Sequence, residues 1–206
     1  MFASYFGFRE NTAKNIDDYS KRYRAIYNGC IIQGSNISLL EQGNYHYGCT
    51  HIPSWKIQEP SDTFSLTIFR DPIKRIISHY KDIMGRVERG EKHHFLKEES
   101  QFLGSSFTDF VDNLPPEKLQ SQLYNFSRNY DQDEAINKIR SLDLILTLED
   151  ISNGIQNINN RLGIDLKLVK KNKSECFKLP STDEINYLSS KIIQEINLFK
   201  KLEISF

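Results

Sequence analysis

The sequence of 206 residues predicts an α/β fold with a mostly parallel sheet, and its apolar patterning is the reason. Two short, nearly continuous apolar segments, 64–69 and 142–147, have the composition of strands that are buried on both faces. The segments between and after them repeat apolar residues at helical spacing. Strands separated by helical stretches are typical of parallel sheets, because the chain must cross over between parallel neighbours.

Composition limits the class of protein before any motif is considered. The sequence is 38% hydrophobic and 12% aromatic, which is typical of a globular protein, and its length fits one domain covering residues 1–206. Basic and acidic side chains are equal in number at 27 each. A neutral chain is not a bulk polycation, so we expect no nucleic-acid partner, and any anion must be bound by a local cluster.

Cysteine usage and the N-terminus predict the compartment. Cys30, Cys49 and Cys176 are far apart and form no CxxC pair, which indicates a reducing compartment and no metal site. Residues 1–10 lack the pattern of a signal peptide, and no stretch of 18 uncharged apolar residues occurs. We therefore expect a cytoplasmic protein with no membrane segment in this chain, although a longer gene product could carry an anchor.

The N-terminal third predicts a helix, a loop and a strand. Apolar residues recur at helical spacing over 12–27, and Asn28-Gly29 would end that helix. Residues 33–44 have loop composition, and 45–52 is a short strand candidate that Pro53 closes.

The buried strand 64–69 leads directly into a helix. Asp71 suits the N-cap and Pro72 the first helical position, so we expect a helix over 72–84. A charged loop or short helix over 86–101 follows. Further helices are expected over 107–111, 116–126 and 133–140. Another is expected over 149–162, with Gly163 just beyond its end. The last is expected over 182–201, with Ser181 or Thr182 and Glu184 at its start.

The chemistry of the chain is concentrated at the end of the 64–69 strand. Arg70 lies where ligands bind in open α/β sheets. Arg75 and Ser78 are three residues apart on the following helix and share a face. A guanidinium and a hydroxyl are good donors to phosphate oxygens, so Arg70 and Ser78 could converge on one phosphate. The alternative is a capped helix with a surface arginine that pairs with an acidic neighbour.

The segment Arg70-Asp71-Pro72-x-x-Arg75-x-x-Ser78-x-Tyr80 resembles the 3′-phosphate-binding motif of the carbohydrate sulfotransferases, which include the heparan sulfate 2-O-sulfotransferases. The resemblance implies a three-layer fold like that of P-loop NTPases. It also implies transfer of a sulfuryl group from 3′-phosphoadenosine 5′-phosphosulfate (PAPS) to a hydroxyl of a glycan or related acceptor. It places Arg70 and Ser78 at the 3′-phosphate, gives Tyr80 a structural role and assigns none to Arg75.

Upstream, Tyr47 to Pro53 resembles the Gly-His-x-Pro strand end of the family, with Thr50 where the family usually has glycine. The resemblance makes His51 the candidate base for the acceptor hydroxyl, because neutral imidazole can accept a proton near neutral pH. Alternatively, His51 is a strand-end histidine bonded to a backbone carbonyl. His46 is a second candidate for the base.

Downstream segments also fall in the order of the family. Residues 146–150 resemble its later strand and helix start, with Glu149 or Asp150 near a helix N-terminus. Residues 170–174 resemble a loop that closes over the nucleotide, which makes Lys173 and Ser174 candidate donors to the cofactor; a solvated basic turn is the alternative for Lys170 and Lys171. His93-His94 has no third ligand at metal spacing, so no metal is expected.

One part of the family pattern has no counterpart in the sequence. Relatives begin with a strand and a phosphate loop of the form Pro-Lys-x-Gly-x-Ser/Thr, whereas no Lys-x-Gly-x-Ser/Thr occurs here. Residues 2–9 resemble the tail of the helix after that loop, so we expect an N-terminally truncated domain without the first strand. Two alternatives to an active sulfotransferase follow. One is a remnant that binds the 3′-phosphate or a sulfated glycan without turnover. The other is a relative of the nucleotide kinases, although their motif Gly-x-x-x-x-Gly-Lys-Ser/Thr is also absent.

Overall fold

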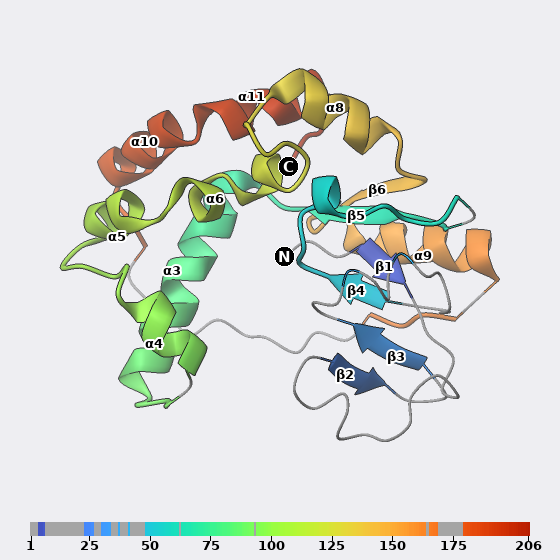
Figure 1. The fold of residues 1–206 in the computed structure, drawn as a ribbon. Helices are drawn as coiled ribbons and strands as arrows, with labels where there is room; N and C mark the ends of the chain where they lie inside the picture. The colour runs from blue at the N-terminus through green and yellow to red at the C-terminus, as the bar shows by residue number, and fades with distance from the viewer. Residues whose placement is uncertain are drawn as a thin grey trace. The chain divides into compact units, whose positions relative to one another are not determined.

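The computed structural model of the chain describes residues 4–6, 23–26, 30–33, 37, 41, 48–61, 63–92, 94–163, 165–168 and 179–206 (Figure 1). The chain forms two compact units. The first comprises Met1–Phe69 and Gln122–Ile151, and the second comprises Arg70–Ser121 and Ser152–Phe206.

In the described part of the first unit, six short strands form three pairs. These are β1 (Ser4–Phe6) with β4 (Gly48–Thr50), β2 (Tyr23–Ile26) with β3 (Cys30–Gln33), and β5 (Leu66–Phe69) with β6 (Leu144–Thr147). The first two pairs are antiparallel and the third is parallel. The predicted α/β class is therefore confirmed, whereas a mostly parallel sheet is not observed within the described residues.

The predicted helix over 12–27 is wrong at its C-terminal end. Tyr23–Ile26 is β2, which pairs with β3 so that Ile26 lies opposite Cys30. Aromatic and β-branched residues suit strands as well as helices, and Asn28-Gly29, between these two strands, is a strong hairpin signal. Residues 12–22 lie outside the described residues.

The parallel pair is built from the two apolar segments that the sequence predicts as buried strands. Phe69 lies opposite Thr147, and the backbone N–H of Leu148 donates to the carbonyl of Phe69 at 2.7 Å, so both strands end at one edge. At the other end the Asp143 carboxylate accepts from the backbone N–H of Ser65 at 2.8 Å. Each strand begins two residues later than predicted.

Buried side chains pack around this pair. The Phe69 and Phe126 rings meet edge to face with centroids 5.7 Å apart. Helix α8 (Gln132–Arg140) begins at the N-cap Asp131, whose carboxylate accepts from the Glu134 N–H at 2.8 Å. Among the residues whose side chains the structure describes, the buried hydrophobic ones of the first unit are Leu66, Phe69, Leu123, Phe126, Ala135, Ile136, Ile139, Leu144 and Leu146.

The described part of the second unit is helical. Its helices are α3 (Pro72–Glu88), α4 (His94–Ser100), α5 (Phe107–Asn113), α6 (Pro116–Leu119), α10 (Thr182–Lys191) and α11 (Ile193–Lys201). The chain passes between the units directly after β5, within α7 (Ser121–Tyr124) and at the first residue of α9 (Ile151–Leu162), so that the rest of α9 belongs to the second unit.

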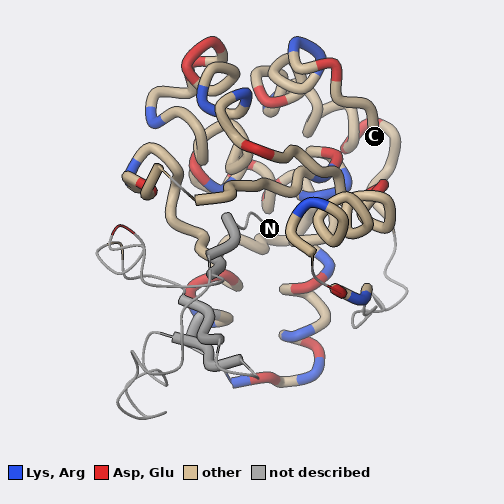
Figure 2. The backbone as a smooth tube through the Cα atoms, turned by 90° about the vertical axis from the view of Figure 1, so that its right-hand side faces the viewer, with Lys and Arg blue, Asp and Glu red and all other residues tan. Residues whose placement is uncertain are grey.

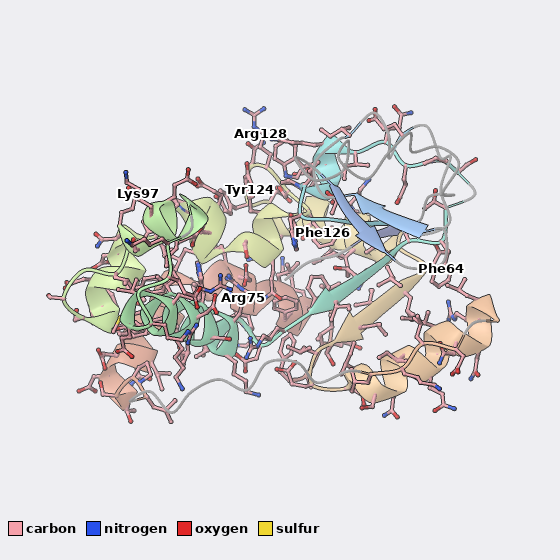
Figure 3. All side chains as sticks on the ribbon, turned by 90° about the horizontal axis from the view of Figure 1, so that it is seen from below. Phe64, Arg75, Lys97, Tyr124, Phe126 and Arg128 are labelled. Carbon is pink, nitrogen blue, oxygen red and sulfur yellow. The ribbon has the colours of Figure 1, made fainter. Side chains whose placement is uncertain are left out.

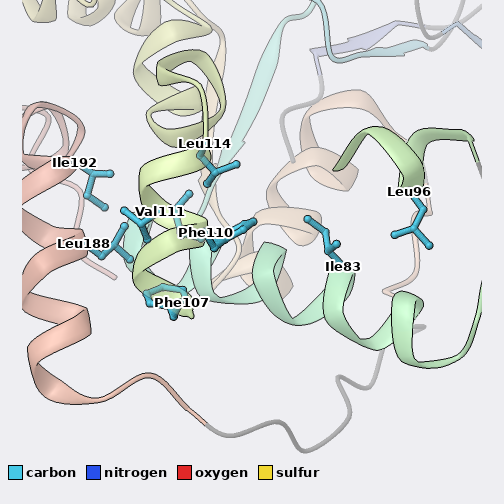
Figure 4. Packing of buried hydrophobic residues seen from close by; sticks show 9 residues of the cluster. Ile83, Leu96, Phe107, Phe110, Val111, Leu114, Leu188 and Ile192 are labelled. Carbon is cyan, nitrogen blue, oxygen red and sulfur yellow. The ribbon is translucent and has the colours of Figure 1, made fainter. Parts of the chain in front are cut away.

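One apolar cluster holds the second unit together. Figure 4 shows Phe107 and Val111 of α5 beside Leu188 of α10 and the following Ile192. Ile76 and Ile83 of α3, with Leu96, Phe110 and Leu114, complete the cluster of buried residues.

Several helix boundaries differ from those predicted. Helix α3 continues to Glu88, four residues beyond the predicted end. The segment 116–126 forms two short helices, and 182–201 is interrupted at Ile192, which has φ −110° and ψ 21°. The start of α10 is as expected: Ser181 accepts from the Glu184 N–H, and the Glu184 carboxylate accepts from the Ser181 N–H.

Candidate functional site

The start of α3 is organised by Asp71 and Pro72, as the sequence predicts. The Asp71 carboxylate accepts from the backbone N–H groups of Ile73 and Lys74 at 2.8 and 2.9 Å. Pro72 is the first residue of the helix, where a missing N–H costs nothing. Two of the free N–H groups of the helix are thus already satisfied from within the chain.

Arg70 and Ser78 both belong to the second unit: Arg70 precedes the N-cap of α3, and Ser78 lies within the helix. Arg70 comes directly after β5 and is partly buried. Ser78 is also partly buried and lies six residues beyond Pro72, which is about 9 Å along the helix axis. Lys74 and Lys81 are four residues before and three after Ser78, so they lie on the same side of α3. Lys74 is exposed and Lys81 partly exposed.

Arg75 has a structural role that sequence reasoning missed. Its guanidinium is buried and donates to the carbonyls of Lys118 at 3.1 Å and Leu119 at 2.6 Å, and pairs with the fully buried Glu195 at 3.2 Å (Figure 3). Arg75 therefore joins α3 to α6 and α11. Glu195 is 120 residues away along the chain, so no local pattern could have revealed this pair.

Tyr80 packs in the apolar cluster of the second unit. Its ring lies 5.2 Å from that of Phe107 and 5.1 Å from that of Phe110, and burial raises the pKa of its phenol. These contacts agree with the structural role that the resemblance gives to Tyr80.

His79, next to Ser78, belongs to a second cluster that the sequence did not reveal. Its Nε2 lies 2.6 Å from a carboxylate oxygen of Glu99 in α4, and the Lys118 ammonium pairs with the other oxygen. The hydrogen bond from His79, assisted by Lys118, lowers the pKa of Glu99 to about 2 even though burial opposes this shift. The cluster links α3, α4 and α6.

His51 belongs to the first unit, where it directly follows β4. Its side chain is exposed, whereas the preceding Thr50 is buried and accepts from the Ile52 N–H at 3.0 Å through Oγ1. The hydroxyl of Thr50 thus fixes the backbone on both sides of His51.

The remaining predicted residues fall into two groups. Glu149 and Asp150 are exposed and come just before α9, which begins at Ile151 instead of Glu149. Lys173 and Ser174 lie outside the described residues, as do His46, Lys170, Lys171, His93 and the side chain of His94.

Charged residues of both signs are spread along the described backbone. Basic and acidic positions are interspersed along it (Figure 2). Where the structure describes side chains, it groups no three His, Cys, Asp or Glu residues in a way that could hold a metal ion. No helix in the described ranges combines the length and apolar character that crossing a membrane requires.

Comparison with known proteins identifies one family. The family model described as "Sulfotransferase family" matches residues 41–199, a span that includes His51, Arg70, Ser78, Lys173 and Ser174. No curated protein matches the chain, and no solved structure does.

Proposed function

Because the chain belongs to the sulfotransferase family, we propose that it transfers a sulfuryl group from PAPS to a hydroxyl of a glycan or related acceptor. The observation that supports this most is that Arg70 comes directly after a buried parallel strand and that Ser78 follows it within the capped helix α3. Ligands of open α/β folds bind beyond the carboxyl ends of such strands.

The hydrogen-bond donors around α3 determine which groups could hold a phosphate there. Asp71 occupies the N–H groups of Ile73 and Lys74, so the helix terminus offers fewer free donors than an uncapped one would. Arg75 donates to backbone carbonyls and Glu195. A 3′-phosphate would therefore be held by side chains, with Arg70 supplying a planar fork and Ser78 a hydroxyl.

His51 is proposed as the general base. Its exposed imidazole can accept the acceptor's hydroxyl proton on a ring nitrogen in its neutral form. When bound, PAPS supplies the sulfuryl group and a stable leaving group. Lys173 and Ser174 are proposed as further donors to the nucleotide, and the cysteine usage supports action in the cytoplasm.

A second candidate function is binding of the nucleotide without turnover. It is favoured by the sequence itself, which contains no Lys-x-Gly-x-Ser/Thr. A lysine in such a loop stabilises charge that develops during transfer, and loss of one well-placed donor costs a factor of about 100 to 1000 in rate.

Calorimetry with adenosine 3′,5′-bisphosphate tests the nucleotide site. Arg70→Ala should weaken binding at least about tenfold, because a charge-assisted contact is lost, and Ser78→Ala should weaken it less. Arg86→Ala is the matched control, since Arg86 is an exposed arginine of α3, the helix that follows Arg70, and pairs with Asp82. Absence of binding, or an equal loss in the Arg86 variant, would contradict the proposal.

A transfer assay with radiolabelled PAPS and a glycan panel then separates the two candidate functions. Transfer that falls by a factor of about 100 or more in His51→Ala, with nucleotide affinity unchanged, supports the enzyme and the role of His51 as base. Nucleotide binding with no transfer to any acceptor supports the second function.

A further inference from the structure

A titratable cluster lies one residue away from the proposed phosphate ligand Ser78. It consists of His79 of α3, Glu99 of α4 and Lys118 of α6, and we call it the His79 cluster. All three residues belong to the second unit, as do Arg70 and Ser78. The Cα atoms of Ser78 and His79 are about 3.8 Å apart, because the two residues are consecutive. A change in the charge of His79 therefore takes place beside the proposed 3′-phosphate site.

Ionic and aromatic contacts hold the His79 cluster in one arrangement. One Glu99 carboxylate oxygen lies 2.6 Å from His79 Nε2, and the other pairs with the Lys118 ammonium. The imidazole meets the Phe110 ring edge to face with centroids 5.6 Å apart, and the Lys118 ammonium lies 5.8 Å from the Phe102 ring centroid. The His79 side chain is nevertheless 28% exposed, so it can exchange protons with the solvent.

The hydrogen bond to Glu99 determines which ring nitrogen of His79 gains or loses a proton. This bond lowers the pKa of Glu99 to about 2, so Glu99 is a carboxylate near neutral pH and can only accept. Nε2 therefore carries a proton in both charge states of His79, and the second proton binds at Nδ1. Protonation thus adds a charge to the imidazole without breaking its contact with Glu99.

Protonation of His79 changes the net charge of the cluster from zero to one positive charge. With a neutral imidazole, the charges of the Glu99 carboxylate and the Lys118 ammonium cancel; with an imidazolium, one positive charge remains. Histidine is the side chain that ordinarily makes such a change between pH 5 and 8. A positive charge beside a phosphate site favours the bound anion.

The elements packed against this part of α3 bring several other charged groups. Within the described residues, the charged groups recorded at its side chains from other elements are Glu99 of α4, Lys118 of α6, Glu184 of α10 and Glu195 of α11. Glu195 pairs with Arg75, Glu184 acts on Tyr80, and α5 presents the uncharged ring of Phe110. On α3 itself, Asp82 pairs with Arg86. Carboxylates, ammonium and guanidinium groups ordinarily keep their charge between pH 6 and 8, so the imidazole is the group that changes there.

We propose that the charge of His79 controls the affinity of the second unit for the nucleotide's 3′-phosphate, and that the imidazolium form binds it more tightly. The inference rests on the proposed function, because it takes Arg70 and Ser78 as the phosphate ligands. His79 is a positioning residue in this scheme: Ser78 makes the contact, and His79 acts on it through the adjoining backbone and through its charge.

The first test compares the pH dependence of nucleotide binding in two proteins. Adenosine 3′,5′-bisphosphate is titrated calorimetrically into the full chain and into His79→Gln between pH 5.5 and pH 8, at low ionic strength to limit screening. The phosphates of the ligand also gain protons in this range, but that effect is common to both proteins and cancels in the ratio of their dissociation constants. As the pH falls, the original chain should gain about two- to fivefold in affinity relative to the variant.

Reciprocal linkage gives a second measurement of the same coupling. If the imidazolium favours the bound nucleotide, the nucleotide favours the imidazolium by the same factor. The midpoint of the His79 imidazole signal in an NMR titration should therefore rise by about 0.3–0.7 pH when the chain is saturated with nucleotide, which is the logarithm of that two- to fivefold factor. The signal that disappears in His79→Gln identifies this residue among the five histidines of the sequence.

Two variants of opposite charge separate an electrostatic role from a purely structural one. At pH 8, Lys118→Met should weaken nucleotide binding about two- to fivefold, whereas Glu99→Gln should strengthen it by a similar factor. Loss of a purely structural contact would weaken binding in both. Lys97→Met is the matched control, since Lys97 is an exposed lysine of α4 two residues before Glu99 and thus on another face of the helix; it should change the affinity less than about twofold. Circular dichroism verifies the fold of each variant, and the Lys118 and Glu99 variants decide if His79→Gln does not fold.

Three results would overturn the inference while nucleotide binding stands: equal pH dependence in the original chain and His79→Gln, a His79 midpoint that the nucleotide does not move, or weaker binding in both charge variants. In each case the nucleotide site remains and only the role of His79 is wrong. Absence of nucleotide binding at every pH would instead overturn the proposed function, and this inference with it.

Discussion

Arg75 lies within the proposed ligand-binding motif, but its contacts stabilise the fold. Its neighbours in the motif, Arg70 and Ser78, are partly exposed, whereas its guanidinium is buried against Glu195 and two backbone carbonyls. Its Nε has no hydrogen-bond partner among the described residues, so the burial is only partly compensated. The buried arginine fixes α3 against α6 and α11 within the second unit, and thereby fixes the side of α3 on which Ser78 lies.

Removing one partner of this buried pair should destabilise the chain strongly. Arg75→Met removes the cation that pairs with the buried Glu195 carboxylate, and Glu195→Gln removes the charge that pairs with the guanidinium; each should cost about 3–5 kcal/mol of unfolding free energy in urea. The double variant should recover part of this loss, because both charges of the pair are then absent. Asp82→Ala, which breaks the exposed pair with Arg86, is the control and should cost at most about 1 kcal/mol. Equal effects of the buried and exposed variants would contradict this role.

At the scale of the element, α3 depends on its cap as well as on its apolar face. Asp71 satisfies two N–H groups at the point where the chain leaves β5 and the second unit begins. A helix whose first turn frays would also move the backbone that leads to Arg70. The cap is therefore important both for the stability of the helix and for the geometry of the proposed phosphate site.

Asp71→Ala should lower the unfolding free energy by about 1 kcal/mol and weaken the binding of adenosine 3′,5′-bisphosphate. Asp71→Asn should retain most of both properties, since the amide oxygen can still accept from Ile73 and Lys74. Chemical denaturation and calorimetry on the same preparations measure the two effects. If the alanine variant were as stable as the asparagine variant, the cap would contribute nothing to α3.

At the scale of the whole molecule, the sequence predicted the strands and helix starts that depend on residues close together in the chain. The apolar segments that form β5 and β6, the Asp71–Pro72 start of α3 and the capping box of α10 each follow from residues that are close in the chain. A helix was predicted where β2 pairs with β3, because Tyr23 and Ile26 of β2 continue the helical spacing of Ile16 and Tyr19. Long-range partners, such as Glu195 for Arg75 and Tyr124 for Trp55, could not be predicted, since the packing that brings them together has no local signature.

Carboxylates of both units make the unfolding free energy of the molecule depend on pH in the acid range. In the second unit, hydrogen bonds from His79, Ser105 and Tyr187 lower the pKa values of Glu99, Asp109 and Asp112, that of Glu99 from 4.5 to about 2. A carboxylate whose pKa is lower in the folded state stabilises the fold above its unfolded pKa, and this contribution is lost as the pH falls through the folded value. In the first unit, burial raises the pKa of Glu59, so its contribution to stability changes with pH in the opposite direction.

The contribution of Glu99 should therefore be full above about pH 4.5 and should disappear as the pH falls towards about 2. Glu99→Gln should cost roughly 1–2 kcal/mol of unfolding free energy near pH 6, a value reduced for the partial exposure of the pair with His79. The difference between the variant and the original chain should shrink steadily between pH 4.5 and pH 3 in urea titrations. Glu98→Gln, on an exposed neighbouring residue, is the control, and it should change the unfolding free energy near pH 6 by at most about 0.5 kcal/mol. A pH-independent effect of Glu99→Gln would mean that its carboxylate contributes through packing and not through its charge.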